Sequence, residues 1–402
     1  MSTLNTIINR QPPRLLEMLP HQSSAVAFDV QDNLFLLPGP VKMHPRVLQA
    51  MAQPAMAHRS PEFGDVNARL FAGLRKLFDT KHVAVLAGSG TAGMDAAVSG
   101  LVHWGDKAVG LENGKFGERM SELAARYAGD SAVTLSTPWG GGFGLDAVEA
   151  QLQEGATSVC FTLNETSTAV MNQGKEIAAL CRKYDALSIA DTITATGNVP
   201  APMDEWGLDV SIVGSQKCIG GPSGLSFVGV SERAYERLDS PSYYLDLKKH
   251  IDRAEKDNQT PYTAAVPLHL ACVEALDMVF EEGLEARFAR TKRLAKACQA
   301  AAEAAGLELA AQDGFRSDTV TSIRYPDGVK DADIRPLLKD EFGVVVAGAQ
   351  AQWKGDVFRI GHMASTTWAE LAGGWAAIEA AFGRIGKPLP KGAAVAAMLD
   401  HA

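Results

Sequence analysis

The stretch DTITATGNVPAPMDEWGLDVSIVGSQK, residues 191–217, decides the fold. It begins with Asp191 at the end of a short apolar run, LSIAD, and ends with Lys217 just after a second run, VSIVG, at residues 210–214. We interpret both runs as strands of an open α/β sheet. Because the carboxyl ends of such strands meet at the ligand crevice, an acid and a lysine at two of these ends can face one small molecule.

An acid and a lysine in this arrangement suit pyridoxal phosphate. This cofactor needs a lysine amine to hold its aldehyde as a Schiff base, and a carboxylate that keeps its ring nitrogen protonated. Lys217 and Asp191 fit these two roles. Each residue alone has a plainer interpretation, Asp191 as the cap of a turn and Lys217 as a solvated surface lysine, so the residues around them must decide.

Length and composition limit the possible domain organisation and the classes of binding partner. With 402 residues the chain exceeds one ordinary core, which predicts two domains or one large domain with a smaller one. A formal net charge of −9, without a run of Lys and Arg, disfavours nucleic acid and anionic membranes as partners. No apolar run reaches the length of a membrane span.

The cysteines point to a reducing compartment. All five are far apart and none forms a CxxC pair, so we expect neither a disulfide framework nor a metal site. The N-terminus lacks the apolar core of a secretory signal. A cytoplasmic location is the simplest expectation.

Short apolar strands alternate with helices through much of the chain. Seven strands with intervening helices predict an α/β fold with a mostly parallel sheet covered on both faces. The predicted strands are HVAVLAG, KAVGLEN, AVTLSTP, SVCFTLN, LSIAD, VSIVGSQK and SFVGVS.

The pattern divides the chain into three parts. Residues 1–33 are polar and mixed, and we expect an N-terminal extension there. Residues 34–265 would form the large cofactor-binding domain, with 34–60 contributing an N-terminal arm. Residues 266–402, with long helices and the strands TSIRYP, GVVVAG and DVFRIGH, predict a smaller C-terminal α+β domain.

A glycine-rich loop, GSGTAG at residues 88–93, lies between the first predicted strand and its helix. Such a loop turns backbone N–H groups and the positive end of the helix dipole towards a phosphate. The same residues satisfy GxGxxG, and Glu112 follows at the end of the next strand, as a dinucleotide-binding oxidoreductase requires. That alternative gives no task to Asp191, Lys217 or Arg359.

Three further side chains stand where a ring and a substrate carboxylate would need them. Phe116 can stack on the ring, or be an ordinary core residue. Thr166 can donate to the ring hydroxyl, or cap a helix. Arg359 can bind a carboxylate with its planar fork, or pair with an internal acid. Cys218, beside the lysine, is interpreted as a small buried residue.

The order of motifs resembles the class V pyridoxal-phosphate-dependent aminotransferases, in particular the alanine:glyoxylate and serine:glyoxylate branch. The resemblance runs from about residue 34 to residue 385 and implies the aspartate aminotransferase-like fold, fold type I. The motifs, in order, are PGP, SGTA, NGKFGER, NETSTAV, AD, MDEWGLDV, SQK, GPSGLS, SYYLDLK, TPYT and FRIGH.

The resemblance assigns a role to each candidate residue. Lys217 would carry the Schiff base, Asp191 would pair with the ring nitrogen, and Phe116 and Ile193 would enclose the ring. Arg359, with Gly39 close by, would bind the substrate carboxylate. Thr166 would hydrogen-bond the ring hydroxyl. The phosphate would be held by Ser89, Gly90, Thr91 and Gln216. The resemblance also implies a homodimer with shared active sites, in which Tyr262 reaches the phosphate from the other subunit.

Two positions depart from the family pattern. Ala265 stands where some relatives use a threonine hydroxyl for the phosphate, a contact that Thr263 could replace. Thr91 stands where animal alanine:glyoxylate enzymes carry histidine.

The resemblance implies transamination from a small amino acid, such as alanine, serine or aspartate, to a 2-oxo acid such as glyoxylate or pyruvate. Lys217 would act as general base. Same-fold aminotransferases acting on ureidoglycine, pyridoxamine, phosphoserine or aminoethylphosphonate remain alternatives. So does a lyase or desulfurase, although a desulfurase needs a loop cysteine and none is apparent after Tyr262 or before Arg359.

Overall fold

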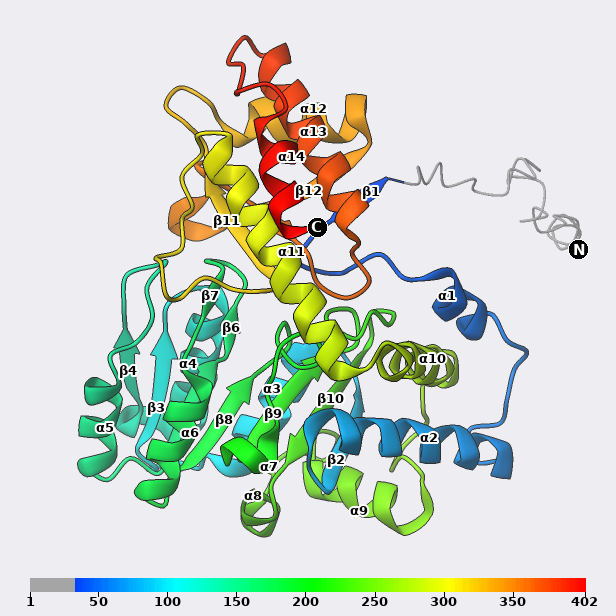
Figure 1. Cartoon of the computed structure of the whole chain (residues 1–402). Coiled ribbons are helices and arrows are strands. Elements are labelled where there is room, and N and C mark those ends of the chain that lie inside the picture. Colours follow the sequence, from blue (N-terminus) through cyan, green and yellow to red (C-terminus); the bar gives the residue numbers. More distant parts are fainter. Residues whose placement is uncertain (1–32) are drawn as a thin grey trace, which may run out of the picture. The chain divides into compact units, whose positions relative to one another are not determined.

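The computed structural model describes residues 33–402, which form one compact unit. The expected N-terminal extension lies outside the described residues, apart from Asn33. The fold is α/β, with a large sheet between helices and a second, smaller sheet (Figure 1). The strands are β1 Leu34–Leu36, β2 His82–Ala87, β3 Ala108–Glu112, β4 Val133–Ser136, β5 Ser158–Thr162, β6 Asn164–Glu165, β7 Val170–Met171, β8 Leu187–Asp191, β9 Val210–Gly214, β10 Leu225–Val230, β11 Val320–Arg324, β12 Val344–Gly348 and β13 Val357–Gly361.

The helices connect and cover these strands. They are α1 Pro45–Met51, α2 Pro61–Phe78, α3 Gly90–Leu101, α4 Lys115–Ala128, α5 Leu145–Gln153, α6 Gly174–Lys183, α7 Met203–Trp206, α8 Glu232–Arg237, α9 Leu247–Asp257, α10 Val266–Glu282, α11 Leu284–Ala304, α12 Asp331–Phe342, α13 Trp368–Arg384 and α14 Ala393–Met398.

The large sheet has seven strands in the order β2-β10-β9-β8-β5-β3-β4. All neighbours are parallel except β10, which runs antiparallel to both β2 and β9. The sequence prediction of a mostly parallel seven-stranded sheet is therefore confirmed. Apolar clusters cover its two faces, and strands such as β8 and β9 are buried along their whole length, as parallel strands must be.

Local signals set the helix ends. Helix α2 begins after Ser60, whose side chain accepts the N–H of Phe63, and Pro61 occupies the first turn. It ends at Asp79 in the left-handed conformation. Helix α13 begins with a capping box made by Thr367 and Glu370.

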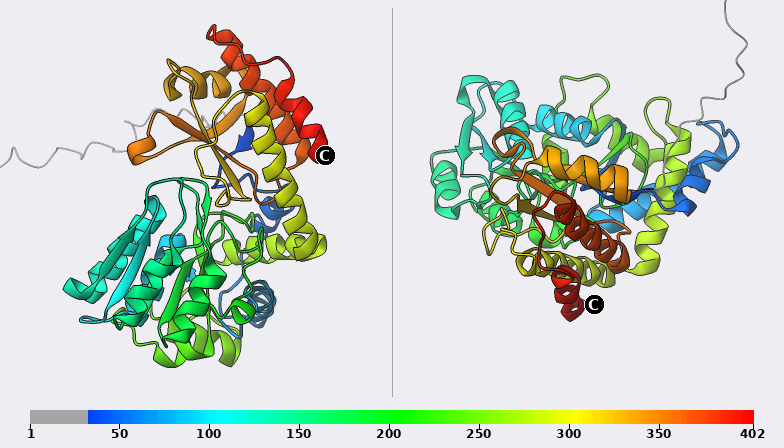
Figure 2. Two further views of the ribbon diagram at one scale, coloured as in Figure 1. Left: turned by 60° about the vertical axis from the view of Figure 1, so that its left-hand side comes forward. Right: turned by 90° about the horizontal axis from the view of Figure 1, so that it is seen from above.

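The smaller sheet has the order β1-β12-β13-β11. The three strands predicted from the C-terminal part are present, but the fourth, β1, comes from the opposite end of the described chain and pairs in parallel with β12. Figure 2 shows this sheet with α11, α13 and α14 packed beside it, apart from the large sheet. Leu36 of β1 belongs to the apolar core of this region.

The domain boundary expected between residues 265 and 266 stays a prediction. Buried residues of α10, such as Cys272 and Leu276, belong to a core of the large sheet, whereas Leu294 and Cys298 of α11 belong to the smaller core. We therefore propose a boundary at Gly283, between these two helices.

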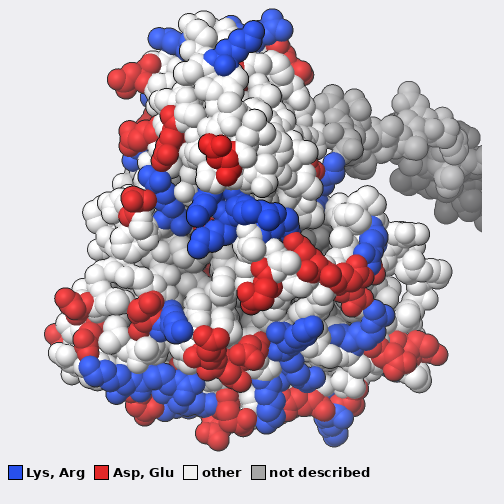
Figure 3. All heavy atoms as spheres, viewed as in Figure 1, with Lys and Arg blue, Asp and Glu red and all other residues white. Residues whose placement is uncertain are grey.

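Charges of both signs are interspersed on the face seen in Figure 3, and Lys and Arg gather over the middle of α11. The exposed basic residues of that helix are Lys292, Arg293 and Lys296. None of the helices in the described range is long and apolar enough for a membrane span.

Candidate active site

Lys217 lies three residues beyond the end of β9, opposite the segment that follows β1. Its Nζ donates to the carbonyl oxygen of Pro38 at 2.8 Å. Gly39 has a φ of 103°, and a Cβ built there would lie 2.2 Å from Cδ of Lys217. Only glycine allows this approach without strain. Burial, together with the charge of Arg359, lowers the pKa of Lys217 to about 8.

Asp191 is the last residue of β8 and is only 3% exposed. The N–H of Ile193 donates to its Oδ1 at 2.9 Å. Burial raises the pKa of Asp191 to about 7, and the charges of Arg119 and Lys217 act in the opposite direction. A cation held against this carboxylate would stabilise its ionised form, so the environment of Asp191 fits a partner for a protonated ring nitrogen.

The start of α3 lies beside the residues that follow Asp191. Ser89 is the N-cap residue of this helix, and its side chain makes no capping hydrogen bond. The first N–H groups of a helix have no partner within it, and the helix dipole makes this end positive. A Cβ at Gly90 would lie 2.4 Å from Cδ1 of Ile193, so the helix can start this close only with glycine. This arrangement fits a phosphate beside a ring.

Gln216 adds an amide to the same region. Its side-chain Oε1 is buried and has no hydrogen-bond partner among the described residues. A buried polar atom without a partner is costly, and the amide can present either its oxygen or its NH₂ group to a ligand. This unpartnered amide also fits a cofactor at this position.

Arg359 lies on β13 and is only 6% exposed. Its Nε and Nη2 donate to the carbonyl oxygen of Gly348, and its Nη1 donates to that of Thr166 at 2.8 Å. These bonds use three of the five guanidinium N–H groups and leave two for a ligand. Within residues 33–402, Arg359 forms no ion pair with an acidic side chain. Burial lowers its pKa to about 10.

Two residues that the sequence analysis left without a role support this site. The carboxylate of Glu165 accepts the backbone N–H groups of Phe116 and Gly117, at 2.9 and 2.8 Å, and so holds the start of α4. Arg119 donates to Oγ1 of Thr91 at 3.0 Å, and its guanidinium lies 5.1 Å from the ring centroid of Phe116. The sequence feature that could have identified Glu165 and Arg119 is their position within the motifs NETSTAV and NGKFGER.

Tyr262 makes no described contact with the residues around Lys217. Its ring packs against Tyr243, Tyr244 and His250, and its hydroxyl donates to the carbonyl oxygen of Tyr243. Tyr243 is 77% exposed, so this aromatic cluster lies at the surface of the chain.

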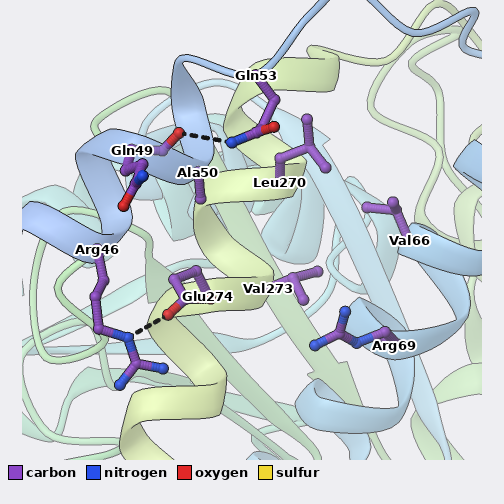
Figure 4. Close-up of a pocket in the computed structure, with 9 residues that line it drawn as sticks. All are labelled: Arg46, Gln49, Ala50, Gln53, Val66, Arg69, Leu270, Val273 and Glu274. Atoms are coloured by element: carbon purple, nitrogen blue, oxygen red, sulfur yellow. Dashed lines mark hydrogen bonds and ion pairs between the residues drawn. The ribbon is translucent and has the colours of Figure 1, made fainter.

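A separate surface hollow of about 350 Å³ lies between α1, α2 and α10 (Figure 4). Arg46 and Glu274 form an ion pair at its edge. None of the candidate residues lines it, so it plays no part in the proposed site.

The described residues give no support for metal-dependent or thiol-dependent chemistry. Within residues 33–402, no group of His, Cys, Asp and Glu side chains is arranged to hold a metal ion. The five cysteines are all buried and free, and burial raises the pKa of Cys218 to about 12. A desulfurase would need an accessible thiol.

Comparison with known proteins defines the class. The model of the class V aminotransferase family matches residues 49–365, and the chain belongs to this family. It is an enzyme of that class, and the family implies pyridoxal phosphate as cofactor. The match favours this assignment over the dinucleotide-binding alternative.

Several of the relatives are named as aminotransferases. An uncharacterised aminotransferase of Methanocaldococcus jannaschii is 39% identical over 89% of this chain and 94% of its own length. The L-aspartate–glyoxylate aminotransferase of Paracoccus denitrificans is 32% identical over 92% and 96%. Among solved structures, the ureidoglycine–glyoxylate aminotransferase of Bacillus subtilis superposes with a TM-score of 0.86 at 29% identity, over 92% and 97%.

Proposed function

We propose that this aminotransferase moves an amino group from a small amino acid, such as alanine, serine or aspartate, to a 2-oxo acid such as glyoxylate or pyruvate. The observation that carries this proposal is the buried guanidinium of Arg359, which has two free N–H groups and no acidic partner among the described residues. Every amino acid and every 2-oxo acid brings the carboxylate that this arginine lacks.

The same residues are proposed to hold pyridoxal phosphate. Ser89, Gly90, Thr91 and Gln216 would bind its phosphate, and Asp191 would face its ring nitrogen. Phe116 and Ile193 would enclose the ring, and Thr166 would contact its hydroxyl. The support is the uncapped start of α3, the buried carboxyl of Asp191 and the unpartnered amide of Gln216. When bound, the cofactor supplies an aldehyde that accepts the amino group and a ring that withdraws electrons.

Lys217 is proposed to be the group that moves protons. Because its pKa is lowered to about 8, a useful fraction of the amine is neutral near pH 7 and can accept a proton. The nearby carbonyl of Pro38 orients Nζ by accepting its hydrogen bond. Arg359, whose charge also acts on Lys217, would fix the substrate carboxylate so that its α-carbon faces the amine.

A homodimer with shared active sites belongs to this proposal. The exposed tyrosine cluster around Tyr262, which makes no described contact with Lys217 in its own chain, is suited to reach a second copy. A cytoplasmic location is proposed because all five cysteines are free.

The visible absorption spectrum of the purified protein tests the proposal. We expect the visible absorption band that gives bound pyridoxal phosphate its yellow colour. Alanine, serine or aspartate, each added separately without any 2-oxo acid, should bleach this band. The Lys217→Ala variant should lack the band and lose turnover. Absence of the band from the wild-type protein after addition of the cofactor, or normal turnover in Lys217→Ala, would contradict the proposal.

A further inference from the structure

A cluster of three charged residues lies where α10 ends and α11 begins. Glu282 is the last residue of α10, and Arg287 and Arg290 lie on the first turns of α11. The carboxylate of Glu282 accepts hydrogen bonds from both arginines, from Nη1 of Arg287 at 2.8 Å and from Nε of Arg290 at 2.6 Å. We call these three residues the junction cluster.

Arg287 connects the junction cluster to the two loops that carry Asp191 and Lys217. It is buried, and its Nε donates to the carbonyl oxygen of Gly197, on the loop that follows Asp191. Its Nη2 donates to the carbonyl oxygen of Cys218, the residue next to Lys217. Both distances are 2.8 Å. One guanidinium therefore holds both loops.

Arg290 connects the junction cluster to the other side of the site. Its Nη2 and Nη1 donate to the carbonyl oxygens of Ala364 and Thr366, at 2.8 and 2.9 Å. These residues follow β13, the strand that carries Arg359. Asn198 adds a direct link, because its side chain accepts the N–H of Ala364 and donates to the hydroxyl of Thr291 on α11.

The position of these arginines is costly in itself. Arg287 lies near the start of α11, where the helix dipole disfavours a cation, and it is 5% exposed, so it has lost most of its hydration. Burial, and then the charge of Arg290, lower the pKa of Arg287. The carboxylate of Glu282 and the backbone carbonyls of Gly197 and Cys218 offset this cost. Packing of two helices does not require such a network.

We propose that the residues of the junction cluster are positioning residues, which fix the position of the Lys217 amine relative to the guanidinium of Arg359. The inference rests on the proposed roles of those two residues. A substrate that is held by its carboxylate at Arg359 reacts only if its α-carbon lies against Lys217, and these residues come from two separately packed sheets. The junction cluster contacts the backbone next to Lys217 and the segment that follows the strand of Arg359.

The test uses the holoenzyme and two mild variants, Glu282→Gln and Arg290→Lys. For each we would measure kcat and KM with the donor that bleaches the visible band, the affinity for acetate from the spectral change it causes, and the Tm. Arg233→Lys is the matched control, because Arg233 also bridges a carboxylate, that of Asp209, and a backbone carbonyl. It does so at the start of β8 and β9, at the opposite end of the strands from the proposed site.

We expect kcat to fall about 10- to 100-fold in both variants, since small displacements of a reacting group have effects of this size. Acetate affinity should stay near the wild-type value, because Arg359 itself is intact. A fall in kcat no larger than in Arg233→Lys would overturn the inference, as would a loss of acetate affinity in proportion to kcat. Failure of the proposed function would look different, because the wild-type enzyme itself would show no donor-dependent bleaching.

Discussion

At the scale of single residues, Arg359 is the side chain whose surroundings say most about the reaction. An arginine this deeply buried normally meets a carboxylate, since an unpaired internal charge is expensive. Here two backbone carbonyls hold the guanidinium, and no acid completes its shell among residues 33–402. The protein therefore keeps a charge and a planar fork available for a carboxylate from outside.

Replacing Arg359 with lysine should weaken carboxylate binding selectively. Lysine keeps the charge but loses the fork, and a bidentate charged pair is worth about 1.5–3 kcal/mol, so we expect the acetate affinity to fall about 10- to 100-fold. The visible band should remain. The control is Arg324→Lys on the neighbouring strand β11, where the arginine pairs with Glu308 at the surface. Equal losses in the two variants would contradict the role of Arg359.

Asp191 leads to a prediction about pH. In the cofactor-free protein its pKa is raised to about 7, whereas in the unfolded chain it is about 3.9. The folded state thus binds the proton more tightly, and the stability that Asp191 contributes is present below pH 4 and is lost as the pH rises towards 7.

The variant Asp191→Asn has no such titration. The stability of this variant relative to the cofactor-free wild type, measured as the free energy of unfolding, should therefore increase by about 1–3 kcal/mol between pH 5 and pH 8. Urea unfolding of both cofactor-free proteins at the two pH values measures this difference. A difference that does not change with pH would show that Asp191 does not titrate in this range.

At the scale of elements, the candidate residues of the large sheet lie at or just after the ends of its strands, whereas Arg359 lies within strand β13 of the smaller sheet. Asp191 ends β8, Lys217 follows β9, and Phe116 lies in the first turn of α4, the helix after β3. The segment after β1 closes over them, since Pro38 accepts a hydrogen bond from Lys217 and Gly39 touches its side chain. Rigid strands thus place loops that carry the chemistry.

Gly39→Ala should displace Lys217. A Cβ at this position would lie within 2.7 Å of both Cε and Nζ, besides straining a backbone with positive φ. We expect loss of the visible band and a fall in turnover of about 100-fold. Gly105→Ala is the matched control, because Gly105 has a φ of 92° and its Cβ would meet nothing within 4 Å. If both variants lose activity equally, strain alone explains the loss.

At the scale of the whole molecule, the path of the chain ties the two sheets together. Strand β1, at the start of the described residues, completes the smaller sheet beside β12, and the chain then returns to the large sheet through α1 and α2. Movement of one sheet relative to the other would therefore act on the segment after β1, which contacts Lys217.

Mixed dimers would reveal whether active sites are shared. Lys217→Ala and Tyr262→Ala homodimers should both be impaired, the second at limiting cofactor concentration. If Tyr262 completes the site of the partner, each mixed dimer regains one intact site, so equal mixing should restore about one quarter of the wild-type sites. Recovery is measured as turnover after subunit exchange. No recovery, despite exchange shown by differently tagged subunits, would place Tyr262 in its own subunit's site.

The sequence by itself determined the α/β class, the seven strands of the large sheet and the family. Strand periodicity and the motifs at strand ends are local signals, and they are fully present in segments such as LSIAD and VSIVGSQK. They also named Asp191 and Lys217, because chemistry at the end of a strand is visible without knowledge of the sheet order.

Only the tertiary structure decided which distant segments meet. The pairing of β1 with β12, the packing of α10 on the large core, and the contacts of Glu165 and Arg287 join residues that are far apart in sequence. No local pattern encodes such contacts, since a buried acid or arginine looks like a surface one until its partners are known. The physical reason is that burial and pairing of charges are properties of the packed chain.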